Sequence, residues 1–543
     1  MKTTTNDLNQ PAVSEQDQPP QQNQQIDALT KQNAILLERL NALEEQNRLL
    51  KQALFGRSSE KTIPVDPDQL TLDIDFFNEA ETIATDEPEQ TESEQVAVTS
   101  EKKPRKRTID LDALPQERIE QPVTEEEQVC SCCNGQRHVI SEVVHRELVV
   151  VPKRMYVRNR ITYKMGCRSC EQHGVDSPIV QTQGPNAVIP KSIASAELLA
   201  LIMIQKYLLA LPLYRQEKDF EREGILLSRQ TMANWMMYAA QTWLLLIYNR
   251  MHEQLRGQSI LHADETRVQV LRENGRAAED QSFMWLYRSG RAENKPIVLY
   301  DYQMSRQQVN PATFLNGFSG YLHVDGFAGY HGLKEVKLAG CWAHARRKFD
   351  EAIIALPKEL KNKPSAAQEG LDYCNQLFSI ERRCKDKTAE ERYAIRQAKS
   401  KPLLEDYLGW LQKQATQITP KSSVGKAVNY CLNQWEKLTT FLEDGRLEID
   451  NNRGERSIKP FVIGRKNWLF SNTPKGADTS AIIYSIIETA KENHLDPQTY
   501  LCKLFEQLPN INVQDVTILD QMMPWSTGIQ ENCKSKKPIP ASK

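Results

Sequence analysis

The stretch from Leu447 to Phe470, LEIDNNRGERSIKPFVIGRKNWLF, concentrates carboxylate, amide and basic side chains. Two of its carboxylates, Asp450 and Glu455, lie among asparagines and cations. Carboxylate oxygens suit a hard divalent ion such as Mg²⁺, and nearby cations allow a polyanion to approach. The alternative is a solvated helix start with Asp450 as N-cap and basic residues in later turns. We predict DNA contacts from five cations of this stretch: Arg453, Arg456, Lys459, Arg465 and Lys466.

Two aspartates upstream stand in strand-like surroundings. Asp264 lies within SILHADETRVQVL, and Asp325 ends the apolar run YLHV before a glycine. Each aspartate alone has a simpler interpretation as a turn or strand-end cap. The order strand, strand, strand, helix, strand is typical of an RNase H-like α/β fold, in which the first and fourth strands adjoin and bring both aspartates together. The predicted strands are 259–271, 283–287, 296–302 and 321–325, with a short helix at 310–315.

Three carboxylates in this arrangement predict phosphodiester chemistry. Two Mg²⁺ ions can activate a water or a 3′-hydroxyl and stabilise the leaving oxygen. An aspartate buried at a strand end without a metal or a cation would be costly. We therefore predict Asp264, Asp325 and Glu455 as catalytic ligands of Mg²⁺ or Mn²⁺. Asp450 remains the alternative to Glu455, because both lie at the start of one predicted helix.

Residues 340–349, GCWAHARRKF, predict a basic helix after the second aspartate. We interpret His344 and Trp342 as packing residues more than DNA contacts. His344 with Arg347 also raises the alternative of a tyrosine recombinase, whose chemistry needs a covalent tyrosyl intermediate and no metal. Residues 351–445 are charged, have a helical pattern and lack metal-ligand spacing, which predicts a helical insertion. The predicted phosphate contacts on the basic helix are Arg346, Arg347 and Lys348.

Two Cys-x-x-Cys pairs predict a structural zinc site. Each pair can supply two thiolates to one tetrahedral Zn²⁺, and the intervening residues alternate as β-strands do. Cys132 is an alternative to either cysteine of the first pair. The competing interpretation is two unrelated pairs of reduced cysteines. The predicted zinc ligands are Cys130, Cys133, Cys167 and Cys170.

A helical segment follows the cysteine pairs. Pro212 predicts a break between helices, Gly224 a turn, and Ser228 the N-cap of the next helix. A helix, a glycine-containing turn and a second helix with a polar start form the arrangement that enters a DNA major groove, although any helical hairpin has a similar pattern. The predicted DNA contacts here are Arg229, Gln230 and Asn234.

The N-terminal region predicts self-association. Leucine recurs every seven residues, and asparagine occupies two partner positions, Asn33 and Asn47. This pattern is typical of a parallel two-stranded coiled coil, in which buried asparagines fix the register and the dimeric state. The alternative is a lone amphipathic helix packed on the body. The heptad leucines are Leu29, Leu36, Leu43 and Leu50.

Charge is balanced overall but segregated along the chain, with 69 Lys and Arg against 71 Asp and Glu. Residues 62–100 are acidic and precede the basic run KKPRKR, so the rest of the chain is net positive and suited to DNA. The odd number of cysteines, 11, and the lack of a secretory leader predict a reducing, cytoplasmic compartment. The most apolar run, 198–211, is too short for a bilayer span, so we expect no membrane association.

These patterns predict a multidomain α+β protein. No phosphate-binding loop of the Gly-x4-Gly-Lys-Ser/Thr type occurs, so ATP is not expected. The predicted parts are a disordered segment (1–25), a leucine-zipper coiled coil (26–61), an acidic linker with a basic end (62–108), a zinc-binding β domain (109–187), a helix-turn-helix-like DNA-binding segment (188–255), an RNase H-like α/β catalytic domain with the helical insertion (256–480), and a C-terminal helical segment with a tail (481–543).

Several motifs together carry a family resemblance. The zipper ending LFGRSSEK, the double-knuckle region, LHADET, HVDGFAGY, GCWAHARRKF and DNNRGERSIKPFVIGRKNWLF occur in this order. In these motifs the chain resembles the DDE transposases of the insertion-sequence-66 family over nearly its whole length. The resemblance implies Asp264, Asp325 and Glu455 as the acidic triad and the four predicted cysteines as zinc ligands. It also implies cutting of terminal inverted repeats, joining of the ends to target DNA, and accessory transposition proteins.

The predicted function is therefore a DNA transposase that acts as a homodimer or higher oligomer through its zipper. Water would cleave at the element end, and the freed 3′-hydroxyl would attack target DNA. One alternative is a non-catalytic DNA-binding regulator, for which the zipper, zinc ribbon and helix-turn-helix would suffice. Another is a nuclease on the same fold, which would cut DNA without joining it.

Overall fold

The computed structural model describes residues 30–33, 36–37, 39–40, 43–48, 155–165, 180–181, 184–357 and 363–535. The chain forms two compact units, one of residues 88–184 and one of residues 1–87 with 185–543. In the smaller unit, β1 (Lys164–Met165) and β2 (Val180–Gln181) pair antiparallel. The predicted zinc ligands Cys130, Cys133, Cys167 and Cys170, the alternative ligand Cys132 and the acidic linker lie outside the described residues.

The described parts of the zipper region are helical. Leu36, Leu40 and Leu43 leave 55%, 55% and 59% of their surface exposed within one chain. Leu29 and Leu50 lie outside the described residues, so the coiled coil stays a prediction.

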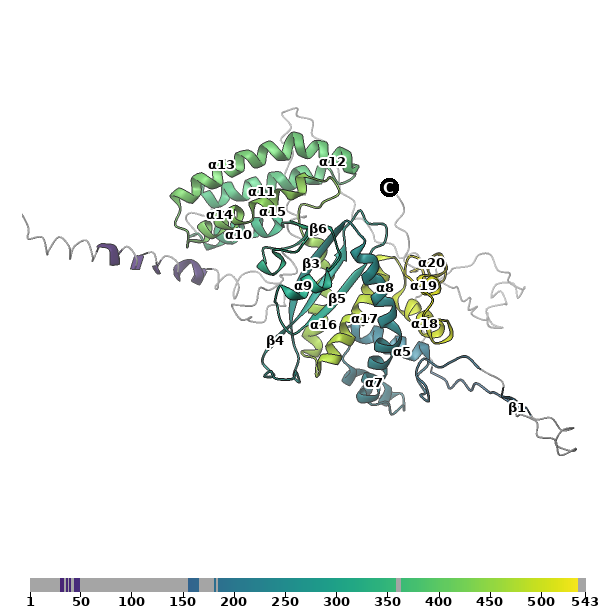
Figure 1. Cartoon of the computed structure of the whole chain (residues 1–543). Coiled ribbons are helices and arrows are strands. Elements are labelled where there is room, and N and C mark those ends of the chain that lie inside the picture. Colours follow the sequence, from purple (N-terminus) through teal and green to yellow (C-terminus); the bar gives the residue numbers. More distant parts are fainter. Residues whose placement is uncertain are drawn as a thin grey trace, which may run out of the picture. The chain divides into compact units, whose positions relative to one another are not determined.

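A five-stranded sheet lies at the centre of the larger unit (Figure 1). The strand order is β5-β4-β3-β6-β7. β3, β4 and β5 pair antiparallel, whereas β6 and β7 run parallel to β3. The first and fourth strands are therefore neighbours, as the sequence predicted, and β7 is an additional strand. Their bounds are β3 (Ile260–Gln269), β4 (Gln281–Ser289), β5 (Val298–Gln303), β6 (Gly320–His323) and β7 (Val336–Ala339), with α9 (Val309–Phe314) and η2 (Ala328–Tyr330) in the connections.

The helix α17 (Pro474–Glu492) covers the edge strand β5. Thr489 Oγ1 accepts a hydrogen bond from the Val298 amide at 3.0 Å and donates one to its carbonyl at 2.9 Å. The Tyr300 amide donates to Ser485 Oγ at 2.8 Å. Side chains of α17 thus satisfy main-chain groups that an edge strand would otherwise leave unpaired. This apolar helix therefore packs on the sheet at its β5 edge.

The helices before the sheet follow their sequence signals. Pro212 directly precedes α6 (Leu213–Arg222), and Gly224 adopts a φ of +77° after it. Ser228 caps α7 (Arg229–Ala239) by accepting a hydrogen bond from the Thr231 amide. The predicted break, turn and N-cap are all present. The flanking helices are α5 (Ala196–Tyr207), the π-helix η1 (Ala240–Leu244) and α8 (Leu245–Arg256).

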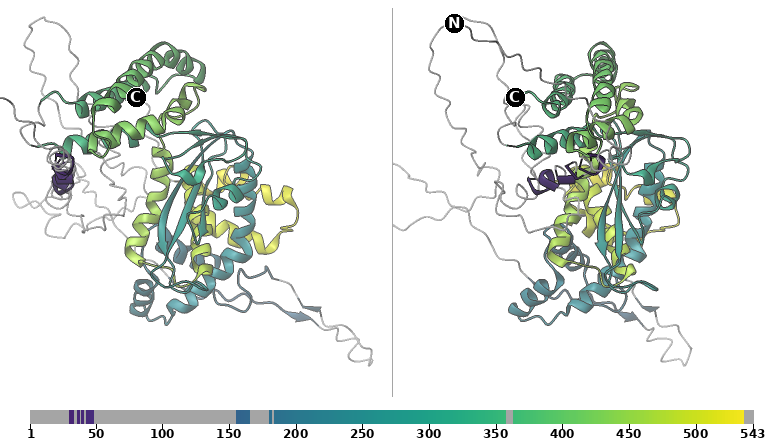
Figure 2. Two further views of the ribbon diagram at one scale, coloured as in Figure 1. Left: turned by 60° about the vertical axis from the view of Figure 1, so that its left-hand side comes forward. Right: turned by 90° about the vertical axis from the view of Figure 1, so that its left-hand side faces the viewer.

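Helices fill the insertion between the second aspartate and Glu455, and Figure 2 shows them in green as one bundle. Trp342, Phe349 and Tyr407 are buried in its core, and α10 packs against α11 and α14. The elements are α10 (Trp342–Ala355), α11 (Ala366–Arg383), α12 (Ala389–Ile395), the π-helix η3 (Arg396–Ser400), α13 (Lys401–Gln417), α14 (Ser423–Asn433), α15 (Trp435–Thr439) and η4 (Thr440–Leu442).

The C-terminal part begins with α16 (Asn452–Trp468), which ends at Leu469 with a φ of +66°. The helices after α17 are α18 (Pro497–Gln507), η5 (Leu508–Asn510), α19 (Val516–Asp520) and α20 (Thr527–Cys533). Within the described residues, no helix is both long and apolar enough to span a membrane. The six cysteines of that part of the chain, from Cys341 to Cys533, are all free thiols.

Candidate active site

The pairing of β3 with β6 brings the two predicted aspartates to one place. His262 of β3 and His323 of β6 are register partners, and each aspartate follows its histidine by two residues. Asp264 therefore lies in the middle of β3, and Asp325 lies just beyond the end of β6. The charge of Asp325 helps to raise the pKa of Asp264, as expected for neighbouring carboxylates.

Asn451 ties the start of α16 to β3 beside Asp264. Its side-chain amide donates to the carbonyl of Ala263 at 2.9 Å. Its side-chain oxygen lies 2.8 Å from His262 Nδ1, and its main-chain amide donates to Cys341 Sγ at 3.2 Å. These contacts place Glu455, in the first turn of α16, next to the sheet.

A buried histidine pair, His262 and His323, precedes the two aspartates on the adjacent strands β3 and β6. The rings of His262 and His323 stack with centroids 4.4 Å apart and an interplanar angle of 12°. Glu448 Oε2 lies 2.9 Å from His262 Nε2 and also accepts from Arg453 Nε at 2.9 Å. Arg453 therefore neutralises Glu448 inside the fold, which differs from its predicted DNA contact. Sequence analysis missed this network, although a His-x-Asp spacing recurs in both strands.

The three carboxylates are buried in a way that disfavours their ionisation. Burial, followed by the charges of Glu265, Glu455 and Asp325, raises the pKa of Asp264 well above its usual value. Burial also raises the pKa of Asp325. Burial is likewise the largest cause that raises the pKa of Glu455 to about 8, whereas Arg347 and Lys459 oppose it. A bound cation would relieve this cost, because it favours the charged form of every neighbouring carboxylate.

Glu455 and Asp450 differ in how their oxygens are satisfied. Glu455 is 3% exposed, and neither of its carboxylate oxygens has a hydrogen-bond partner among the described residues. Asp450 accepts hydrogen bonds from the main-chain and side-chain amides of Asn452 at 3.0 and 2.9 Å. The N-cap residue of α16 is Asn451, so the simpler interpretation of Asp450 as N-cap was wrong, but the oxygens of Asp450 are satisfied by Asn452 just before the helix. Glu455 has the unsatisfied oxygens that a metal ion needs.

Glu265, the neighbour of Asp264, holds the loop that follows Asp325. Arg306 Nε donates to Glu265 at 2.8 Å, and the Tyr330 hydroxyl donates to the same carboxylate. Arg306 also lies over the ring of Phe327, 3.6 Å from its centroid. Burial and the charge of Asp325 raise the pKa of Glu265 to about 7, against the opposing effect of Arg306. The adjacent Asp-Glu pair in one strand was the sequence signal for this residue.

The structure separates the predicted DNA-binding cations by exposure. Arg346 is buried and donates to Asn375 at 2.9 Å, so it packs α10 against α11. This differs from the predicted phosphate contact, which would need an exposed side chain. Lys348 lies 4.9 Å from the ring centroid of Tyr430, and half-buried Arg465 donates to Thr266. The positive charge of Arg347 acts to lower the pKa of Glu455, against the larger effect of burial. Lys459 is half-buried. The predicted contacts with exposed side chains are Arg229, Gln230, Asn234, Arg456 and Lys466.

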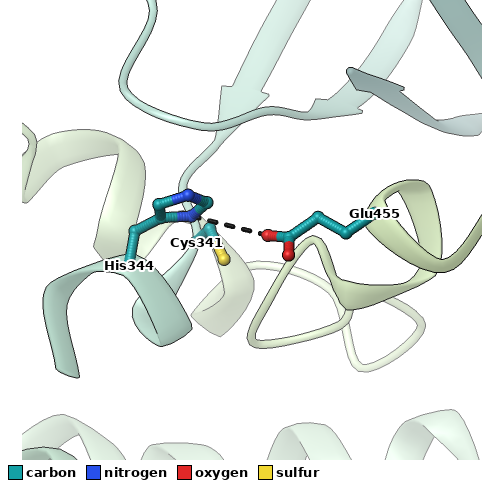
Figure 3. Close-up of side chains that lie close together, drawn as sticks. All are labelled: Cys341, His344 and Glu455. Atoms are coloured by element: carbon teal, nitrogen blue, oxygen red, sulfur yellow. Dashed lines mark ion pairs between the residues drawn. The ribbon is translucent and has the colours of Figure 1, made fainter. Parts of the chain in front are cut away.

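Cys341 and His344 lie beside Glu455 (Figure 3). Cys341 is the N-cap residue of α10, and His344 is in its first turn. Burial lowers the pKa of His344 to about 3, so its imidazole is neutral at pH 7. The Nδ1 of His344 lies 3.6 Å from Glu455 Oε1, so the residue that the sequence suggested for packing also lies next to the third predicted carboxylate. The Cys-x-x-His spacing in GCWAH was the signal that sequence analysis did not use.

Comparisons with known proteins agree with the resemblance. The profile of the Transposase IS66 family matches residues 191–479. A profile described as Transposase C of IS166 homeodomain matches residues 42–119, and that of the IS66 C-terminal element matches residues 485–525.

Proteins of Sinorhizobium fredii (strain NBRC 101917 / NGR234) are similar over most of their length. Protein y4hP is 31% identical over 89% of this chain and 88% of its own. Protein y4jD is 30% identical over 88% of this chain and 93% of its own. With the family profile matched across the sheet, the insertion and α16, this chain belongs to the IS66 family of transposases.

Proposed function

We propose that this protein binds the terminal inverted repeats of a mobile element and catalyses metal-dependent DNA cleavage and strand transfer on an RNase H-like domain. The observation that carries the proposal is the convergence of Asp264, Asp325 and Glu455 from β3, the end of β6 and α16. Their mutual effect on pKa supports a shared site. Family membership supports the reaction class.

The three carboxylates would hold Mg²⁺ or Mn²⁺. Their fit to such ions rests on the buried oxygens of Glu455, which have no hydrogen-bond partner among the described residues, and on the burial and neighbouring negative charges that raise the pKa of Asp264. Hard ions of this kind prefer carboxylate oxygens. When bound, divalent ions would supply activation of a water or a 3′-hydroxyl and stabilisation of the leaving oxygen.

The protein's own residues would position this chemistry and bring DNA to it. Asn451 fixes the first turn of α16, and with it Glu455, against β3. Exposed Arg456 and Lys466 on α16 would contact phosphates beside the carboxylates. The polar start of α7 would read the element ends together with the predicted zinc ribbon.

Self-association would bring two ends together. The exposed leucines of the zipper region would pair two protomers, and higher oligomers would form on synapsis. We place the protein in the cytoplasm, where it would act on DNA with accessory transposition proteins.

Strand transfer of a labelled, pre-cut element end into plasmid DNA tests this function. Asp264→Asn, Asp325→Asn and Glu455→Gln should abolish joining while DNA binding persists. Asp450→Asn is the matched control and should join, because the oxygens of Asp450 are already hydrogen-bonded to Asn452. An inactive Asp450→Asn beside an active Glu455→Gln would reassign the third ligand.

The same assay, run also with an uncut labelled element end, separates the alternative functions. If the unmodified protein cuts without joining, the nuclease is correct. If it binds ends but neither cuts nor joins even with the accessory proteins, the regulator is correct. Joining that resists EDTA would contradict a metal-dependent reaction.

A further inference from the structure

Cys341, His344 and Glu455 bring three different metal-binding groups to one point (Figure 3). One ligand atom from each side chain, the thiol sulfur, a ring nitrogen and a carboxylate oxygen, lies within 4.8 Å of the other two. Cys341 and His344 come from the N-terminal end of α10, and Glu455 comes from the first turn of α16. Two helix starts that are distant in sequence therefore form one ligand set.

The spacing of His344 and Glu455 fits a shared metal ion better than a hydrogen bond. Nδ1 of His344 lies 3.6 Å from Oε1 of Glu455, which is too long for a good hydrogen bond. Tetrahedral Zn²⁺, with bonds of about 2.0–2.1 Å to nitrogen and oxygen, separates two such ligand atoms by about 3.3 Å. His344 Nδ1 and both oxygens of Glu455 are buried and lack hydrogen-bond partners within the described residues. A metal ion would satisfy His344 Nδ1 and one oxygen of Glu455.

The sulfur decides which class of metal suits the site. Mg²⁺ prefers oxygen ligands, whereas thiolate with imidazole selects Zn²⁺ and similar ions. The main-chain amide of Asn451 donates to Cys341 Sγ at 3.2 Å, a contact that orients and stabilises a metal-bound thiolate.

We propose that Cys341, His344 and Glu455 bind one thiophilic divalent ion such as Zn²⁺, with one tetrahedral position left for a further ligand. This site is distinct from the predicted cysteine zinc site and from the hard-ion site of the aspartates, although it shares Glu455 with the latter. The inference goes beyond the proposed function and does not depend on it, because binding needs no DNA.

Cadmium binding to the full chain tests the proposal, because a cadmium–thiolate bond gives a charge-transfer absorption in the ultraviolet. Ions bound per chain are counted by metal analysis after equilibrium dialysis, without chelator, so that metal at other sites contributes equally to each variant. Cys341→Ser should bind one ion fewer than the unmodified chain and lose part of the absorption. His344→Gln and Glu455→Gln should weaken binding of the same ion by at least about 10-fold.

Cys431→Ser is the matched control. Cys431 is another buried free thiol, in α14, and its replacement should leave the ion count unchanged. Equal ion counts for Cys341→Ser and the unmodified chain would overturn the proposal. If thermal unfolding shows that Cys341→Ser does not fold, the two Gln variants decide in the same assay. Failure of strand transfer with normal cadmium binding would overturn the proposed function alone.

Discussion

Two buried ionisable side chains, Arg396 and Glu455, differ in whether their polar atoms have hydrogen-bond partners. Arg396, in η3, has no exposed surface and donates to Glu381 at 2.8 and 2.7 Å. It also donates to three main-chain carbonyls between residues 441 and 447. Glu455 is 3% exposed, and its oxygens have no hydrogen-bond partner in the described part of the chain.

The difference separates structural charges from functional ones. A buried charge is tolerated when every polar atom is bonded, and Arg396 meets this condition by joining α11 to the segment that leads into α16. A buried carboxylate without partners is costly and is kept where it binds a ligand. Replacement of Arg396 should therefore reduce stability, and replacement of Glu455 should reduce activity.

Arg396→Met should have the largest effect on stability. Its removal leaves Glu381 and three carbonyls without their donor, and breaking a buried ion pair costs about 3–5 kcal/mol. Denaturant unfolding measures the loss. Arg382→Met, an exposed residue of α11, is the control and should change stability by less than about 0.5 kcal/mol. Equal stability of the two variants would show that the network around Arg396 does not hold the insertion together.

Glu455→Gln should show the opposite pattern. Loss of a metal ligand should slow strand transfer on the order of 10³-fold, about 4 kcal/mol. Without metal ions the variant should unfold at the same temperature or a higher one, because it removes a buried carboxylate that has no hydrogen-bond partner among the described residues. Strand transfer and thermal unfolding are measured on the same preparation. A clear drop in metal-free stability would mean that Glu455 is a structural residue.

The elements that carry their own local signals could be predicted from sequence. Ser228 caps α7, and Asp264 and Asp325 follow adjacent strands, because capping and strand alternation depend on neighbouring residues. The strand β7 was missed because it has four residues, VKLA, too few to establish an alternation. Its place in the sheet depends on pairing with β6.

The contacts around the site depend on tertiary packing that no local pattern contains. Asn451 bonds Ala263 across 188 positions of the chain, so its role could not be read from spacing. Arg346 was predicted to face DNA, but the face of α10 on which it lies packs against α11. A run of basic residues gives charge, and only packing decides which of them reach solvent.

Asn451→Ala should have an intermediate effect. It removes the bond to Ala263 and leaves His262 Nδ1 without its contact, at a cost of about 1–3 kcal/mol. Strand transfer should also slow, because the first turn of α16 carries Glu455. Asn467→Ala, near the exposed end of the same helix, should change both measurements little. If Asn451→Ala loses stability but keeps full activity, Asn451 does not position Glu455.

Magnesium should have the smallest effect on stability, and this effect distinguishes Glu455 from Asp450 as the third ligand. An ion that binds only the folded protein stabilises it by about 1.4 kcal/mol at ten times its Kd. Thermal unfolding of the unmodified chain should therefore shift upward with Mg²⁺, and Glu455→Gln should reduce the shift. Asp450→Asn should keep it, because the oxygens of Asp450 are already bonded to Asn452. A shift lost in Asp450→Asn and kept in Glu455→Gln would reverse the assignment, because Asp450 would then be the ligand.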